Sequence, residues 1–136
     1  MKSYNSILAG ILILLFIPSA CKNHGSKTNK PEVVAVSFIK HLSAFEFDKA
    51  KALGTQNTCN MIDILQSLYD LGIKQGTDMG QISKEVEVEV VRVAVDGDAA
   101  VVTYLDENGK EQTIDLIKEK GKWLVDLKKE MKPGEG

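Results

Sequence analysis

The stretch that decides the fold is residues 85–127, EVEVEVVRVAVDGDAAVVTYLDENGKEQTIDLIKEKGKWLVDL. Valine alternates with glutamate from residue 85 to residue 90, and the alternation continues in the opposite phase from Val91. Alternation of apolar and polar residues with a period of two is typical of a β-strand with one buried face. A one-residue β-bulge near Val90 and Val91 keeps the apolar side chains on one face through the change of phase. We therefore expect a bulged strand over residues 85–95.

Three dipeptides that favour tight turns divide the rest of this stretch: D-G at 96–97, N-G at 108–109 and K-G at 120–121. Turns this short join neighbouring antiparallel strands. In the last segment Trp123, Val125 and Leu127 share a face. The predicted sheet is a four-stranded antiparallel meander with strands over residues 85–95, 99–105, 110–118 and 122–127.

Helical spacing of apolar residues precedes the strands. Pro31 suits the first turn of a helix over residues 31–45, where a missing N–H group has no cost. Asp48 is expected to cap a short helix over residues 49–53, which Gly54 ends. A third helix is expected over residues 57–71, and the glycines at 72, 76 and 80 then predict a loop.

Helices followed by an antiparallel meander predict an α+β fold. We expect the N-terminal helices to pack in the concave face of the curved four-stranded sheet, which gives a cone-like roll. The domain covers residues 31–127, a length that suits one hydrophobic core. The charged segment 128–136 ends in Pro and Gly and is expected to be a disordered tail.

The N-terminus carries the pattern of an export signal. Lys2 precedes an apolar run over residues 7–17, and Ser19 and Ala20 stand before Cys21. The run is too short to span a bilayer as a helix, which takes about 20 residues. The segment resembles the lipobox of bacterial lipoproteins, which implies cleavage after residue 20 and acylation of Cys21. An ordinary secretory signal or an uncleaved anchor is the alternative.

The rest of the N-terminal region and the charge bear on location and partners. Residues 21–30 are expected to be the acylated cysteine and a flexible linker, KNHGSKTNK. Without Lys2 the chain keeps 16 basic and 19 acidic residues, a net charge of −3 that does not favour nucleic acid. By the same resemblance, Lys22 after the acylated Cys21 implies an anchor on the periplasmic face of the outer membrane in the bacterial cell envelope.

Four segments of the chain resemble a larger superfamily. They are PEVVAVSFI at 31–39, FDKAKAL at 47–53, VDGDAAVVT at 95–103 and GKWLV at 121–125. They resemble the nuclear-transport-factor-2-like (cystatin-like) superfamily, and within it small bacterial lipoproteins of uncharacterised function. The resemblance implies a conical cavity between sheet and helices, and some members form dimers. The candidate residues that line the cavity are Phe38, Leu42, Leu65, Tyr69, Tyr104 and Trp123.

The sequence contains few residues of the types that commonly serve in catalysis or metal binding. His41 is expected at the surface, Cys59 reads as an inert thiol, and no pair of residues stands at metal-ligand spacing. The Glu85, Glu87 and Glu89 row would present three carboxylates on one strand face, most simply as a solvated face. We therefore expect no metal and no cofactor.

These patterns predict a non-catalytic, lipid-anchored domain that binds a small apolar ligand or an envelope partner protein. One alternative is a structural module whose core is filled by its own side chains and whose sheet supplies a homodimer face. A second alternative is an isomerase- or dehydratase-like enzyme that uses Tyr69 or Tyr104. An open cavity distinguishes ligand binding from the structural module.

Overall fold

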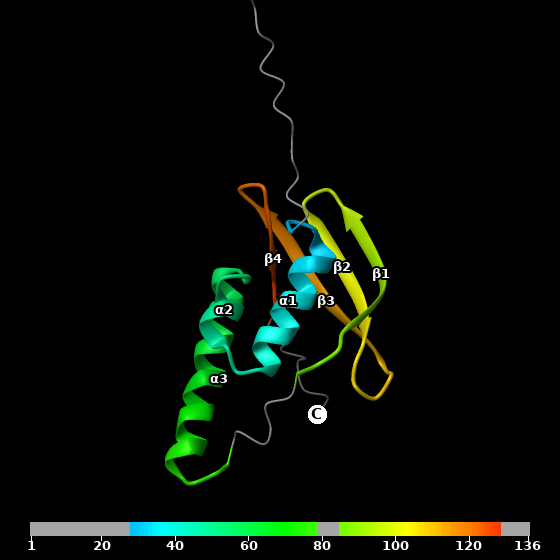
Figure 1. Cartoon of the computed structure of the whole chain (residues 1–136). Coiled ribbons are helices and arrows are strands. Elements are labelled where there is room, and N and C mark those ends of the chain that lie inside the picture. Colours follow the sequence, from blue (N-terminus) through cyan, green and yellow to red (C-terminus); the bar gives the residue numbers. More distant parts are fainter. Residues whose placement is uncertain (1–27, 79–84, 129–136) are drawn as a thin grey trace, which may run out of the picture.

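The computed structural model describes residues 28–78 and 85–128 of the chain. The predicted signal segment, Cys21, most of the linker, Gly80 and the tail beyond Lys128 lie outside the described residues. Within them the order is helices first and strands second (Figure 1). The elements are α1 (Pro31–Ser43), α2 (Phe47–Lys51), α3 (Gln56–Lys74), β1 (Glu89–Asp96), β2 (Ala99–Leu105), β3 (Glu111–Glu119) and β4 (Lys122–Val125).

The sheet is the predicted antiparallel meander, with strand order β1-β2-β3-β4. The register between β1 and β2 shifts between Val90 and Arg92, which confirms the predicted bulge. Gly97, at φ 58°, begins the two-residue turn between β1 and β2, because Asp96 still pairs with Ala99. A positive φ in a two-residue hairpin turn gives the backbone a twist that matches the twist of the flanking strands.

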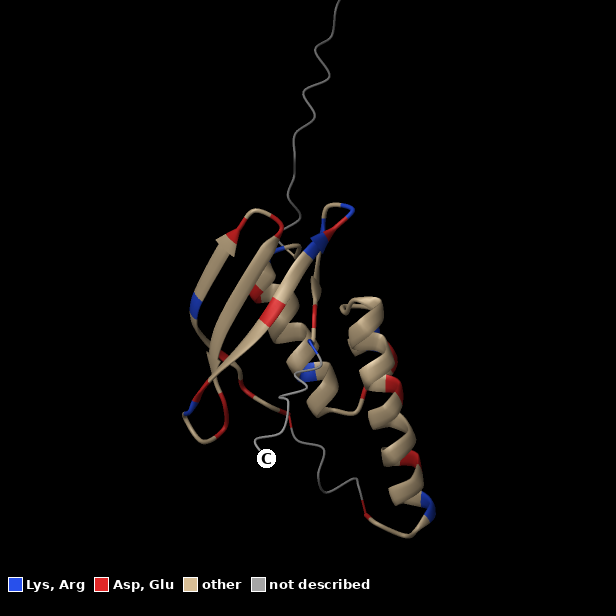
Figure 2. Ribbon diagram, turned by 180° about the vertical axis from the view of Figure 1, so that it is seen from behind, with Lys and Arg blue, Asp and Glu red and all other residues tan. Residues whose placement is uncertain are grey.

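Helix α1 and the sheet form two layers. The helix crosses the concave face of the sheet and contacts all four strands (Figures 1 and 2). The core between them is apolar, and α2 and α3 close its β4 side with Phe47, Ala50 and Ile62. The other buried apolar residues are Val34, Ala35 and Phe38 of α1 and Ala100, Val102, Ile114, Leu116, Trp123 and Val125 of the sheet.

The connection between α2 and α3 lies along the free edge of β4. The N–H group of Val125 donates to the carbonyl oxygen of Leu53 at 2.8 Å, and the N–H group of Thr55 donates back to Val125 at 2.9 Å. Gly54 makes an isolated parallel bridge to Val125. These contacts cover an edge that would otherwise expose unpaired backbone groups.

Three local predictions need correction. Asp48 does not cap α2, because the helix begins one residue earlier, at Phe47, and Asp48 lies inside its first turn. Gly72 does not end the third helix, which continues to Lys74 and is followed by Gly76 at φ 80°. Of the three glutamates in the predicted row, only Glu89 lies in a strand.

Helix α3 does not pack in the concave face. Its first turn touches the end of β4, and the helix then runs along α2 and beyond the sheet, away from the end where the chain enters α1 (Figure 1). Thr58 and Ile62 are its buried residues. No helix in the described part of the chain is long and apolar enough to span a bilayer.

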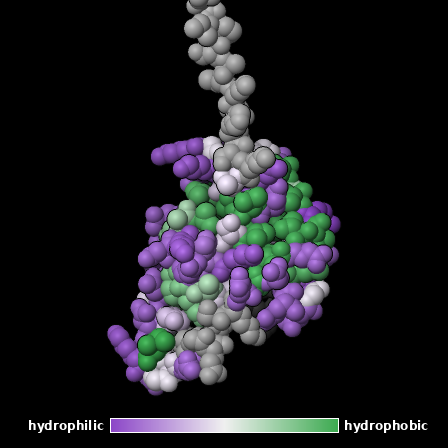
Figure 3. All heavy atoms as spheres, viewed as in Figure 1, coloured by the Kyte–Doolittle hydropathy of each residue, from purple (hydrophilic) through white to green (hydrophobic). Residues whose placement is uncertain are grey.

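Hydrophobic side chains also reach the surface. In the space-filling view they gather over α1 and β1, and a smaller group lies toward the far end of α3 (Figure 3). In β1 the exposed valines are Val91 and Val95.

Candidate functional site

An open hollow lies between the C-terminal half of α1 and the inner face of β2 and β3. We call it the sheet hollow. Its volume is about 300 Å³. Ser43, Tyr104 and Thr113 bring polar atoms to a lining that is otherwise aliphatic and aromatic. The remaining lining residues are Phe38, Ile39, Leu42, Ile114 and Leu127.

Tyr104 is a lining residue of the sheet hollow whose pKa departs from its ordinary value. Partial burial raises the pKa of its hydroxyl, and the negative charge of Asp106 adds to this effect. The hydroxyl therefore keeps its proton at neutral pH and is able to donate a hydrogen bond.

The carboxylate of Asp106 is already engaged by its own hairpin loop. One oxygen accepts from the N–H groups of Asn108 and Lys110, both at 2.9 Å, and the other accepts from the Gln112 amide at 3.0 Å. These donors hold the pKa of Asp106 below its usual range, and the hydrogen bond from Gln112 contributes most. The carboxylate thus organises the β2–β3 turn.

A second hollow of about 280 Å³ lies between the end of α1 and α3, and we call it the helix hollow. Phe45, Phe47 and Tyr69 form an aromatic cluster on its wall, with ring centroids 4.6 Å apart for Phe45 and Tyr69 and 5.5 Å apart for Phe47 and Tyr69. Phe45 has φ 57°, a backbone conformation rare for a residue with a side chain. Leu42, Leu65 and Leu68 complete the lining.

The candidate cavity residues fall into four groups. Phe38 and Tyr104 line the sheet hollow, Leu65 and Tyr69 line the helix hollow, and Leu42 lines both. Trp123 lines neither hollow. It is buried in the core, with the ammonium group of Lys118 5.4 Å from its ring centroid.

The other lining residues were not among the candidates: Ile39, Ser43, Thr113, Ile114 and Leu127 in the sheet hollow, and Phe45, Phe47 and Leu68 in the helix hollow. The F-E-F sequence at 45–47 was a usable signal, because two aromatic residues flanking a tight connection between helices must pack against something. Leu127 was placed on the inner face of the last strand but not in the cavity.

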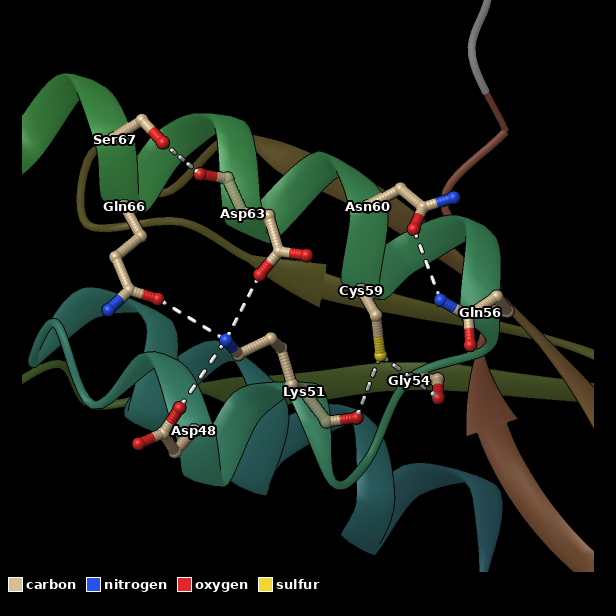
Figure 4. Close-up of polar contacts among 9 residues, drawn as sticks. All are labelled: Asp48, Lys51, Gly54, Gln56, Cys59, Asn60, Asp63, Gln66 and Ser67. Carbon is tan, nitrogen blue, oxygen red and sulfur yellow. Dashed lines mark hydrogen bonds and ion pairs between the residues drawn. The ribbon is translucent and has the colours of Figure 1, made fainter.

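A polar cluster joins α2 to α3 (Figure 4). It lies on a different face of α3 from the residues that line the helix hollow. The ammonium group of Lys51 lies 3.0 Å from an Asp63 carboxylate oxygen, 3.3 Å from Asp48 and 3.2 Å from the amide oxygen of Gln66. The Asp63 contact is the main reason that the pKa of Lys51 is raised. The half-buried thiol of Cys59 donates to the carbonyl oxygen of Lys51 at 3.3 Å. This arrangement fixes α3 against α2.

His41 lies near the surface and contacts Glu46. Its Nδ1 is 2.5 Å from a Glu46 carboxylate oxygen, and Lys49 contacts the other oxygen at 2.6 Å. Lys49 and then His41 lower the pKa of Glu46. Among the described residues, the buried polar side chains are threonines 55, 58 and 103, and no group of three metal-ligating side chains is present.

Comparison with known proteins bears on the fold. No protein-family model matches the chain, and no curated protein sequence matches it. A solved structure, that of a candidate NTF2-like transpeptidase from Campylobacter jejuni, is similar to it with a TM-score of 0.50. The fold is NTF2-like. The similarity covers 73% of this chain and 99% of that one at 20% sequence identity, so it establishes the fold and leaves the activity open.

Proposed function

We propose that this chain is a lipid-anchored protein of the bacterial cell envelope whose NTF2-like domain binds a small, mainly apolar molecule in the sheet hollow without catalysis. The observation that carries the proposal is the sheet hollow itself. It opens between α1 and the sheet, beside fully packed core residues such as Phe38 and Val102. An unfilled apolar space of this kind favours a ligand over a core filled by its own side chains.

The shape and chemistry of the hollow restrict the ligand. Its volume of about 300 Å³ is at the lower end of the range of known ligand pockets, about 300 to 1,000 Å³. The protonated Tyr104 hydroxyl supplies a donor at the wall. The ligand is therefore a compact apolar molecule with at least one hydrogen-bond acceptor, such as a carbonyl or ether oxygen.

Absence of catalysis is part of the proposal. The similar Campylobacter jejuni protein is named as a candidate transpeptidase, and acyl transfer of that class needs a nucleophile beside a general base. The half-buried thiol here, Cys59, donates to backbone carbonyl oxygens, and His41 faces Glu46. Neither geometry activates a nucleophile.

The anchor is tested separately from the ligand. Thioether-linked lipid on Cys21 would hold the full-length protein in the membrane fraction. We expect Cys21→Ser to release it and to abolish incorporation of labelled fatty acid. If the variant stays in the membrane fraction with unchanged mobility, the anchor proposal is wrong.

Native mass spectrometry of residues 28–136, purified gently from bacterial periplasm, tests the ligand. We expect a reproducible added mass in the wild-type domain and its loss in Ser43→Phe, which places a ring at the mouth of the sheet hollow. Ser67→Phe is the matched control, because Ser67 lies on the exposed surface of α3, far along the chain from the hollow. A wild-type domain without added mass would favour the structural module instead.

A further inference from the structure

The most exposed apolar surface on the helices is a stripe along α3, which we call the α3 stripe. It consists of Ile64, Leu65, Leu68 and Leu71. Ile64 and Leu68 are 63% and 59% exposed, values that are unusual for large aliphatic side chains within a well-formed helix. Together these side chains expose an apolar area on the order of a few hundred Å², the size of the largest patch on a typical monomer, which is often functional.

The spacing of the stripe matches a helix-to-helix seam. Ile64, Leu68 and Leu71 of the stripe follow one another at intervals of four and three residues, and the half-buried Met61 precedes Ile64 by three, which gives the a/d spacing of two coiled-coil heptads. Side chains at this spacing pack into the gaps of a second helix that carries the same pattern. The stripe therefore favours a helix as its partner.

The charged residues of α3 indicate which kind of partner helix would pack on the stripe. Asn60 and Ser67 flank the stripe on one side and Gly72 flanks it on the other, Lys74 follows on the first side past the end of the stripe, and Asp63 lies in the Lys51 cluster. The acidic residues of α3 lie along one side of the helix (Figure 2). Two copies of this helix would therefore meet without like charges at the seam, and a strongly basic or acidic partner would find no complementary flank.

The position of α3 disfavours the bilayer as the partner. The chain enters the domain beside the β3–β4 turn, where the Asn29 amide donates to the Gly121 carbonyl oxygen at 2.8 Å. Helix α3 ends at the opposite end of the molecule (Figure 1). If Cys21 holds the lipid as proposed above, the anchor joins the domain at the end opposite to the end of α3.

We propose that the α3 stripe is a homodimer interface, in which α3 of one molecule packs against α3 of a second copy. A two-fold interface requires a surface that is complementary to itself, and a heptad stripe with uncharged flanks meets that requirement. The helix hollow, which shares Leu65 and Leu68 with the stripe, extends the apolar surface toward α1. The stripe has no residue in common with the sheet hollow, so dimerisation does not occupy the proposed ligand site.

The interface is small. The α3 stripe provides less than the roughly 800 Å² per partner of a standard stable complex, so the dimer is expected to be reversible. A common membrane tether would strengthen it, because it confines two copies to one surface and raises their effective concentration.

Photo-crosslinking in bacterial cells tests this proposal on the full-length chain. Two forms of the protein with different epitope tags are expressed together, and a photoreactive amino acid replaces Leu68. We expect an adduct of twice the protein's mass that carries both tags. The matched control places the same amino acid at Asp70, which lies on the same helix but away from the stripe, and little adduct is expected there.

The outcomes separate the proposal from its alternatives. No two-tag adduct at Leu68, an equal yield at Asp70, or two-tag adducts only from a probe at Val101 on the sheet would each overturn it. An adduct of Leu68 with one tag and a foreign protein would also overturn it. Ile64→Glu, a change at an exposed position, is expected to reduce the two-tag adduct at least tenfold while membrane fractionation stays unchanged.

Discussion

Removal of a single buried hydroxyl, that of Thr58, is the sharpest test of how α3 is joined to the sheet. The residue is completely buried in the first turns of α3. Its hydroxyl donates to the carbonyl oxygen of Val125 at 2.7 Å and accepts from the N–H group of Leu127 at 2.9 Å. The hydroxyl of Thr55 lies 3.2 Å away, but its single proton is shared between Thr58 and the Asp126 carboxylate at 3.0 Å.

Thr58→Val keeps the shape of the side chain and removes the hydrogen bonds to Val125 and Leu127 and the shared contact with Thr55. The Val125 oxygen still accepts from the Thr55 N–H group, and the Thr55 hydroxyl still has Asp126 at 3.0 Å, but the Leu127 N–H group is left without a partner. At about 1 kcal/mol for each net hydrogen bond, the free energy of unfolding should fall by about 2 to 3 kcal/mol. For a domain of this size, that corresponds to a drop in Tm of roughly 10 °C.

Urea denaturation followed by the fluorescence of Trp123 measures the change. The matched control is Thr58→Ser, which keeps the hydroxyl and loses one methyl group, and we expect it to cost about 1 kcal/mol. A Thr58→Val protein as stable as the wild type, or more stable than Thr58→Ser, would refute the argument that hydrogen bonds at this residue hold the helix to β4.

Three further predictions concern Gly54, Lys51 and Asp106. Gly54→Ala would place a Cβ atom 2.6 Å from the Thr58 methyl group, so we expect a loss of about 1 to 3 kcal/mol in denaturant titrations and a smaller loss in a Thr58→Ser background. Lys51→Met should speed amide hydrogen exchange along the middle of α3, whereas Lys49→Met, which removes an exposed pair with Glu46, should not. Because hydrogen bonds lower the pKa of Asp106 from its ordinary 3.8, its ionised form contributes stability above that pH, which is lost as the pH falls through the lower pKa of the folded state. Asp106→Asn should remove this part of the acid dependence in NMR-monitored unfolding, and an unchanged acid transition would contradict it.

The sheet was readable because its signals are local. Alternation and the turn dipeptides follow from the geometry of neighbouring residues, and the structure confirms both the meander and the bulge at Val91. The first strand, however, begins at Glu89 and not at residue 85. The ends of helices were less predictable. Asp48 and Gly72 each have the residue type of a helix boundary, but packing of Phe47 into the core and continued hydrogen bonding through Gly72 extend the helices past them.

The candidate cavity residues were likewise predictable where local spacing decides their position and not where packing between elements decides it. Phe38, Leu42 and Tyr104 were predicted as lining from their inward positions on a helix and a strand, and they line the sheet hollow. Leu65 and Tyr69 were placed with them because they share a face of the third helix, yet they line a different hollow. Periodicity shows which side chains share a face and says nothing about which element that face meets.

By itself, the sequence determined the α+β class, the order of the elements, the register of the hairpins and the export-signal pattern, because each depends on residues close together in the chain. Only the tertiary structure decided the angle of α3. That angle is set by Lys51 with Asp63 and by Thr58 with Val125, partners 12 and 67 residues apart. Contacts between such distant residues leave no periodic trace in the sequence. They divide the apolar residues of α1 and α3 between two hollows and an exposed stripe, and so they determine which surfaces are open to a ligand and to a second copy.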